Sequence, residues 1–252
     1  MKTLLFIGHP GHELLAYKFL QNHKPLVIFL TTGSGNTGNP RIEGSIELLE
    51  SLGLKVFKPF EPFTDRQIYN LIMEWDFDEF AKVKSALKQF IEEHNVKRIV
   101  GDALEGFNPS HDLCRYLING TVQDLASSSS LANYDFLQDE VFKNADTLKN
   151  KDDIILKLDD QELQDKLSAC RIYSQLKFEV DRFFEQYGAD FFRLEYFRKI
   201  TDTKHISTWE GEMPFYEIHG RKRVEEGIYK KALLFEDHMK PLAHFLLRST
   251  PQ

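Results

Sequence analysis

The sequence has 252 residues, of which 42% are hydrophobic, and a net charge of −7. A chain of this length can bury one large core, and we favour a single α/β domain over two small ones. The negative charge offers no broad basic surface, so neither nucleic acid nor a membrane is an expected partner. The two cysteines, Cys114 and Cys170, lack CxxC spacing, which favours reduced thiols and a cytoplasmic location.

The first hundred residues alternate between apolar runs and helix-like stretches. The runs at Leu4–Ile7 and Pro25–Leu30 are almost continuous, as is typical of strands buried on both faces. No run approaches the roughly 20 apolar residues of a membrane span. Further strands are predicted over residues 54–57 and 97–102, and helices over residues 41–52 and 80–94. We therefore expect a Rossmann-like, mostly parallel sheet with helices on both faces.

The second half of the chain is less regular. Residues 160–187 have the apolar spacing of one or two long helices, which Gly188 would stop. Residues 127–130 and 144–153 are predicted to be loops, and the tail beyond Ile200 has no clear period. We expect one domain over residues 1–180 and a C-terminal helical and irregular extension over residues 181–252, packed on the same domain.

Polar side chains gather in the loops that follow the predicted strands. In open parallel sheets, ligands bind beyond the carboxyl ends of the strands, so these loops are expected to converge on one cleft. The loop after the second strand is rich in Thr and Gly over Thr31–Gly35. The loops after the first strand and after the strand over residues 97–102 hold the titratable and amide side chains, namely His9, His12, Glu13, Asp102, Glu105, Asn108, His111 and Asp112.

Three of these side chains are imidazoles, from His9, His12 and His111. Three protein ligands with one open position is the arrangement of catalytic zinc, and another divalent metal that accepts imidazole would also suit. Nearby carboxylates would orient the histidines or act as a base. The alternative is that each histidine is structural, because the sequence has no strong spacing signature such as HExxH.

Several motifs resemble those of the PIG-L/LmbE-like N-acetylglucosaminyl deacetylases. His9-Pro10-Gly11-His12-Glu13 is similar to the His-Pro-Asp-Asp-Glu motif of that family, and Asn108-Pro109-Ser110-His111-Asp112 is similar to its later His-containing motif. Thr31–Gly35 and Asp165–Gln175 give weaker support, so the resemblance covers roughly residues 1–180. It implies a zinc hydrolase with a Rossmann-like fold.

The resemblance assigns roles to individual residues, and three positions depart from the family. His9 and His111 match ligating histidines, while His12 stands where the family has a ligating Asp. Gly11 replaces the Asp regarded as the base, and Asn108 replaces a His that helps to stabilise the oxyanion. Loss of a positioned base typically lowers the rate by about 10² to 10⁴. Glu105 is our first choice as a substitute, followed by Glu13 and Asp112.

The resulting hypothesis is a zinc-dependent N-deacetylase that acts on a small-molecule sugar or glycoconjugate. Asn108 would donate to the oxyanion, and Glu105 would move the protons. Two alternatives are a catalytically silent protein that binds metal or sugar, and a nucleotide-sugar-binding or transferring enzyme that uses the loop Gly33–Gly38, which lacks GxGxxG. The tail could complete its own cleft or that of a second copy in a homo-oligomer. Further candidates for the cleft wall are Asp65, Arg66, Tyr69, His205, Trp209 and Glu210.

Overall fold

The computed structural model describes residues 1–35, 38–136, 150–173, 177–201 and 213–248. Within these ranges the chain forms a sheet with the strand order β2-β1-β3-β4-β6-β5. The first four strands are parallel, and β6 runs antiparallel to both of its neighbours. The bounds are Thr3–Ile7 (β1), Leu26–Phe29 (β2), Arg98–Asp102 (β3), Ala132–Phe136 (β4), Ile154–Lys157 (β5) and Leu194–Lys199 (β6). The predicted mostly parallel α/β sheet is confirmed.

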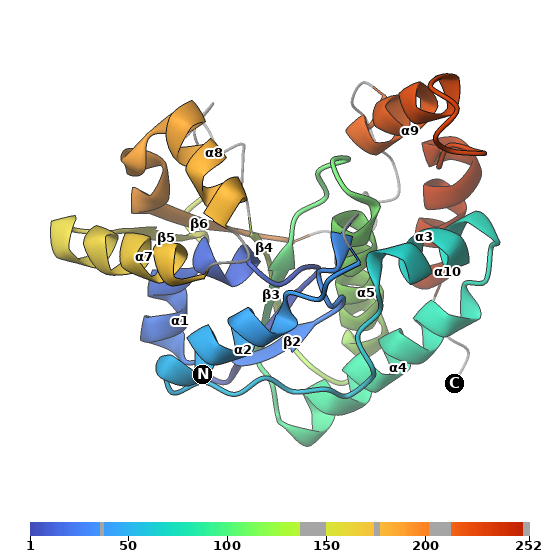
Figure 1. Cartoon of the computed structure of the whole chain (residues 1–252). Coiled ribbons are helices and arrows are strands. Elements are labelled where there is room, and N and C mark those ends of the chain that lie inside the picture. The colour runs from blue at the N-terminus through green and yellow to red at the C-terminus, as the bar shows by residue number, and fades with distance from the viewer. Residues whose placement is uncertain (36–37, 137–149, 174–176, 202–212, 249–252) are drawn as a thin grey trace.

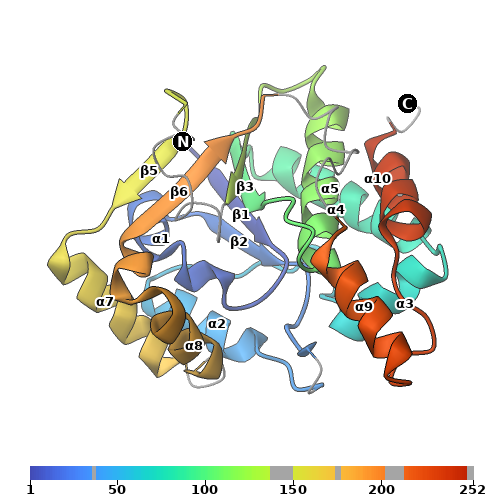
Figure 2. The same ribbon diagram turned by 90° about the horizontal axis from the view of Figure 1, so that it is seen from above.

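Helices surround this sheet (Figures 1 and 2). Three short helical segments are η1 (His12–Leu14), η4 (Ala189–Arg193) and the π-helical η6 (Phe235–Met239). The α-helices are α1 (Tyr17–His23), α2 (Ile42–Ser51), α3 (Asp65–Met73), α4 (Asp78–Glu93), α5 (Pro109–Leu125), α7 (Asp160–Ile172), α8 (Lys177–Tyr187), α9 (Phe215–Glu225) and α10 (Lys240–Leu247). None of the helices in the described ranges has the length and apolar character needed to cross a membrane.

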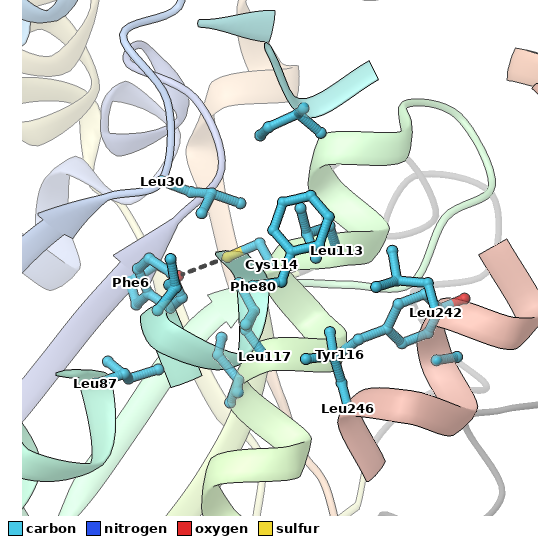
Figure 3. Packing of buried hydrophobic residues seen from close by; sticks show 14 of the residues in the cluster. Phe6, Leu30, Phe80, Leu87, Leu113, Cys114, Tyr116, Leu117, Leu242 and Leu246 are labelled. Carbon is cyan, nitrogen blue, oxygen red and sulfur yellow. Dashed lines mark hydrogen bonds between the residues drawn. The ribbon is translucent and has the colours of Figure 1, made fainter. Parts of the chain in front are cut away.

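Both faces of the parallel strands are buried, which explains their continuous apolar runs. Leu4 and Phe6 of β1 point into a core built with α3, α4, α5 and α10. Leu5 and Ile7 point to the opposite face, into a core built with α1 and α2. Figure 3 shows the first core, in which Phe6 lies beside α5 and the Cys114 thiol donates to the Phe6 carbonyl oxygen over 3.4 Å.

Helix α5 lies very close to the strand beneath it and to the C-terminal helix. A Cβ atom on Gly101 of β3 would lie 2.2 Å from Ile118 Cδ1, and one on Gly120 would lie 2.4 Å from the Leu246 carbonyl oxygen of α10. Lys84 of α4 donates to the same Leu246 oxygen over 3.0 Å. Glycine at these two positions lets α5 pack closely against β3 on one side and against α10 on another.

A buried ion pair joins α7 to β6. Lys166 and Glu195 lie 2.8 Å apart, and both side chains are completely buried. Glu195 also accepts the backbone N–H groups of Lys18 and Phe19 in the first turn of α1, each over 2.8 Å. These contacts tie α7, β6 and α1 together. Lys166 lies in the Asp165–Gln175 stretch of the family resemblance.

The structure departs from the sequence-based expectation at one predicted strand. Residues 54–57 make only a single bridge, between Val56 and Val27 of β2, because this short segment follows the outer edge of the sheet. One or two helices were predicted within residues 160–187, and the structure has two, α7 and α8; Gly188 follows α8 with a φ of 75°. The sheet includes β6, which lies beyond residue 180. The predicted division into a domain over residues 1–180 and an extension over residues 181–252 stays a prediction. His205, Trp209 and Glu210 lie outside the described residues.

Candidate metal centre

Three histidines from distant parts of the sequence meet at the carboxyl edge of the sheet. His9 follows β1, His12 begins η1, and His111 lies in the first turn of α5. Each offers a ring nitrogen, and these three atoms lie within 4.8 Å of one another. The ring centroids are separated by 4.5 to 5.6 Å. His9 and His111 are buried, and His12 is half-buried.

The close approach of β1, β3 and α5 produces this cluster. Strands β1 and β3 are parallel neighbours, so their carboxyl ends lie side by side. Gly8 then passes against the end of β3 and the first turn of α5. A Cβ atom at Gly8 would lie 2.7 Å from Asp102 Oδ2 and 3.3 Å from the Ser110 carbonyl oxygen. A residue without a side chain is therefore required just before His9.

Each histidine has its own carboxylate on one ring nitrogen. His9 Nε2 contacts Asp65 Oδ1, His12 Nδ1 lies 2.9 Å from Asp102 Oδ1, and His111 Nδ1 lies 3.3 Å from Glu105 Oε2. Such carboxylates fix the ring orientation and tautomer of metal-binding histidines. The remaining nitrogens, Nδ1 of His9 and Nε2 of His12 and His111, are the ones that can bind an ion.

The three imidazoles fit a divalent metal ion. His9 Nδ1 is buried and has no hydrogen-bond partner among the described residues, which typically costs about 1–3 kcal/mol unless a ligand satisfies the atom. Binding requires neutral imidazole. Burial lowers the pKa of His9 to about 4, and burial also lowers the pKa of His12. Burial opposes protonation of His111 as well, but the nearby Glu105 and Asp102 outweigh it and raise the pKa of His111.

Asp65 and Asp102 are held in the charged form. Burial alone would raise the pKa of each carboxyl, but the contacts with His9 and His12, respectively, outweigh burial and hold both pKa values well below the usual range. Asp102 also accepts the Gly8 N–H over 2.5 Å, and Asp65 accepts the Gly35 N–H over 2.6 Å. These anions lie behind the histidine rings and offset positive charge at the cluster.

Asp65 reaches the site through a contact that the sequence pattern does not reveal. The chain at Phe63 forms a parallel bridge with Thr31, immediately beyond the carboxyl end of β2. The Thr64–Gln67 capping box then starts α3 and places Asp65 beside His9. Sequence alone suggested Asp65 as part of the cleft wall. The structure makes it the hydrogen-bond partner of His9.

The buried guanidinium of Arg115 supports the site by binding the backbone of β3 and β4. The sequence pattern did not point to this residue. Arg115, one helical turn after His111, donates to the carbonyl oxygens of Asp102 (2.6 Å), Gly101 (2.8 Å) and Tyr134 (2.9 Å). These acceptors lie on β3 and β4. Arg115 therefore fixes α5 relative to the strand that carries Asp102. The available signal was a charged residue within the short apolar run Leu113–Ile118.

Two predicted catalytic carboxylates are engaged in supporting contacts. Glu13 is fully buried, accepts the Gly11 N–H over 2.7 Å and accepts the hydroxyl of Ser45. Asp112 is also buried and accepts the N–H groups of Glu105 and Gly106 over 3.0 and 3.2 Å. Burial raises the pKa of both carboxyls to about 7. Their contacts stabilise the two loops that carry the histidines.

The other predicted residues, Glu105, Asn108 and Gly11, are only partly buried. Glu105 is bound to His111, and its side chain is 20% exposed. Asn108 is the N-cap of α5, where its Oδ1 accepts the Ser110 N–H over 2.9 Å. The opposite end of the Asn108 carboxamide is the hydrogen-bond donor. Gly11 has a φ of 111° at the start of η1, so no side chain occupies the position of the family's base.

The fold is similar to that of several solved deacetylases. A triple mutant of the deacetylase Orf2, involved in teicoplanin biosynthesis, matches with a TM-score of 0.53 and 15% identity over 80% of this chain and 100% of that chain. The zinc-inhibited form of teicoplanin deacetylase Orf2 matches with a TM-score of 0.50, 12% identity and the same coverage. Dbv21, the deacetylase of the A40926 pseudoaglycone, matches with a TM-score of 0.50 and 14% identity over 79% and 97% of the two chains.

These similarities define the class of fold. The chain has the Rossmann-like α/β fold of these deacetylases, so the resemblance to the PIG-L/LmbE-like proteins is confirmed at the level of structure. The identities of 12–15% make this a likeness of fold. No family model and no curated protein matches the sequence.

Proposed function

We propose that this protein is a zinc-dependent hydrolase that removes the N-acyl group from an N-acetylated sugar or glycoconjugate. One observation supports this proposal above all others. Three neighbouring imidazoles each carry a carboxylate on one ring nitrogen and leave the other nitrogen for an ion. A set of three nitrogen ligands with an open position suits zinc, and another divalent metal is also compatible.

The histidines would hold the ion through His9 Nδ1, His12 Nε2 and His111 Nε2. When bound, zinc polarises the amide carbonyl and lowers the pKa of water. Asp65, Asp102 and Glu105 would keep the rings oriented and compensate for the absence of a carboxylate ligand, since His12 stands where the family has Asp. The Asn108 amide N–H would donate to the oxygen that becomes negatively charged in the transition state.

Proton transfer is the step for which Gly11 provides no group. Glu105 is the best substitute among the predicted carboxylates, because its side chain is partly exposed; to take a proton at the open position it would have to leave His111 Nδ1, which lies on the ring edge away from the ion. Glu13 and Asp112 are buried and accept backbone N–H groups. We therefore assign proton transfer to Glu105, and we assign support of the two histidine loops to Glu13 and Asp112.

Metal content and hydrolysis together test this function. Purified wild-type protein is expected to contain about one equivalent of zinc or another divalent metal by elemental analysis, and His111→Ala is expected to lose most of it. His244→Ala changes an exposed histidine of α10 and serves as the matched control. Release of acetate from N-acetylglucosamine and its glycosides would then be followed. Absence of turnover from fully metallated protein would reject the catalytic part of the proposal.

A catalytically silent metal-binding protein is the second candidate, and the observation that favours it is Gly11. If Glu105 cannot replace the missing base, metal content will be normal while no substrate is hydrolysed. Turnover by the fully metallated wild type separates these cases. In an active enzyme Glu105→Gln should lower turnover by about 10²- to 10⁴-fold, and metal content is measured alongside because Glu105 also contacts the candidate ligand His111.

Nucleotide-sugar binding is less compatible with the contacts of the Gly-rich loop. The N–H groups of Gly33, Gly35 and Gly38 donate to Thr31 Oγ1, Asp65 Oδ2 and the Ser34 carbonyl oxygen, respectively. A phosphate-binding loop directs such groups to the ligand instead. The loop supports Asp65 and, through it, His9.

A further inference from the structure

Two exposed aromatic rings stack on each other, and one of them lies in the loop that leads to His111. Phe107 lies in the loop between β3 and α5, and Phe215 begins α9. Their ring centroids are 4.9 Å apart with an interplanar angle of 10°, although each residue is 50% exposed. The ring of His219 stacks on Phe215 at 5.9 Å. We call these three rings the aromatic stack.

The loop that carries Phe107 also carries the reactive part of the proposed site. Phe107 directly precedes Asn108, the N-cap of α5, and His111 lies in the first turn of that helix. Glu105, two residues before Phe107, contacts His111. In Figure 1 this loop rises at the same end of the sheet as α9. Only three residues of chain therefore separate Phe107 of the aromatic stack from His111 of the histidine cluster.

Both halves of the aromatic stack are held in place by buried contacts. Asp112 accepts the N–H groups of Glu105 and Gly106, which anchors the loop before Phe107. In α9, the buried Glu217 accepts the Phe235 N–H over 2.8 Å and Arg221 Nη2 over 2.7 Å. The rings are thus presented by anchored backbone, so little further ordering is needed when a ligand binds.

Exposed apolar side chains are concentrated around the aromatic stack. Met213 and Ile218 are 49% and 51% exposed, and both lie within three residues of Phe215. Clusters of exposed apolar residues mark binding sites more often than single ones do. Aromatic rings prefer parallel-offset or edge contacts with another ring, so a flat apolar group is the ligand that this surface would recognise best.

We propose that the aromatic stack is the substrate-binding wall of this site and takes an apolar, preferably aromatic, group attached to the amide that is hydrolysed. This inference rests on the proposed amide hydrolase function and adds the class of substrate. The group could belong to the acyl side or to the aglycone of the sugar, and both share the same chemistry. Phe107 and Phe215 are then determinants of specificity beside the histidines.

Binding is tested separately from hydrolysis. Calorimetry with p-nitrophenyl and methyl N-acetyl-β-glucosaminide probes the aglycone side, and N-benzoyl against N-acetyl methyl glucosaminide probes the acyl side. At least one aromatic probe should bind wild-type protein about three- to tenfold more tightly than its small counterpart, and Phe215→Ala should remove this preference. Trp75→Ala is the matched control, because Trp75 is 54% exposed and stacks on Phe77, which is not part of the aromatic stack. Circular dichroism and thermal unfolding verify that each variant is folded.

The outcomes separate this inference from the proposed function. An aromatic preference that Phe215→Ala abolishes and Trp75→Ala retains supports the wall even if no probe is hydrolysed. Equal binding of aromatic and small probes, no binding of any probe, or an equal loss in Trp75→Ala overturns it. A wild-type dimer that Phe215→Ala dissociates would assign the rings to a contact between copies and would also overturn it. Phe107→Ala should reproduce the effect of Phe215→Ala.

Discussion

Asp102 joins the two strands of the site by accepting the Gly8 N–H with one carboxylate oxygen and contacting His12 Nδ1 with the other, over 2.5 and 2.9 Å. The first contact fixes the chain before His9, and the second fixes the ring of His12. One side chain at the end of β3 thus positions two of the three candidate ligands. Its charge is maintained because the neighbouring histidines favour the carboxylate despite burial.

Asp102→Asn is expected to weaken metal binding by about 10- to 100-fold, as changes in such supporting carboxylates typically do. The amide keeps the shape of the side chain but removes the negative charge beside His12. Competition with a chromogenic zinc chelator measures the affinity. Asp124→Asn, which changes a carboxylate paired with Lys84, is the control. Unchanged affinity in Asp102→Asn would show that this contact does not support the ion.

Glu13→Gln should change how stability depends on pH. Burial raises the pKa of Glu13 from 4.5 to about 7, so the folded state binds more protons than the unfolded state between these values. Wild-type stability therefore loses up to about 1.4 kcal/mol per pH unit from this group as the pH rises from 4.5 to 7. Gln does not titrate, so the variant should gain stability relative to wild type over that window. Urea unfolding at several pH values measures the difference, and parallel curves would contradict the prediction.

Gly120→Ala is expected to destabilise the fold by about 1–3 kcal/mol, because the added methyl group would lie 2.4 Å from the Leu246 carbonyl oxygen. Helix α10 would have to move away from α5 and from Lys84. Urea unfolding measures the loss. Gln123→Ala changes a half-buried residue on the same helix and should alter stability by no more than about 0.5 kcal/mol. Equal stability of Gly120→Ala and wild type would show that α10 moves at little cost.

Lys166→Met should destabilise the protein by about 3–5 kcal/mol, because it leaves Glu195 charged and buried without its partner. The double variant Lys166→Met/Glu195→Gln should recover more than half of this loss. A neutral amide oxygen can still accept the N–H groups at the start of α1. Chemical unfolding of the two variants gives both values. A double variant less stable than Lys166→Met would show that the charge of Glu195 matters more to α1 than to the pair.

Much of the fold could be predicted from local sequence patterns. The continuous apolar runs at β1 and β2 are typical of strands buried on both faces, and the amphipathic spacing of α2 and α4 has the helical period, so these patterns indicate their structures directly. Residues 54–57 have the composition of a strand but too few neighbours at the sheet edge to form one. The antiparallel strand β6 was not predicted, because its partner β4 lies about sixty residues earlier in the chain.

The candidate site was predicted in part. The rule for the carboxyl ends of parallel strands brought His9, His12 and His111 to one edge, where the structure places them. It could not assign a carboxylate to each ring. Asp65 depends on the bridge between Phe63 and Thr31, and Arg115 depends on the packing of α5 against β3 and β4. Such contacts arise from tertiary structure and have no period in the sequence.

The backbone at Gly11 limits how this site can be altered by mutation. Its φ of 111° belongs to a region in which side chains are strained, so an aspartate introduced there would not simply restore the carboxylate of the related deacetylases. The peptide would first have to turn, which would also pull the Gly11 N–H away from Glu13. A Gly11→Asp variant therefore needs a second, compensating substitution in the turn. The effects of the two substitutions on activity should be strongly non-additive.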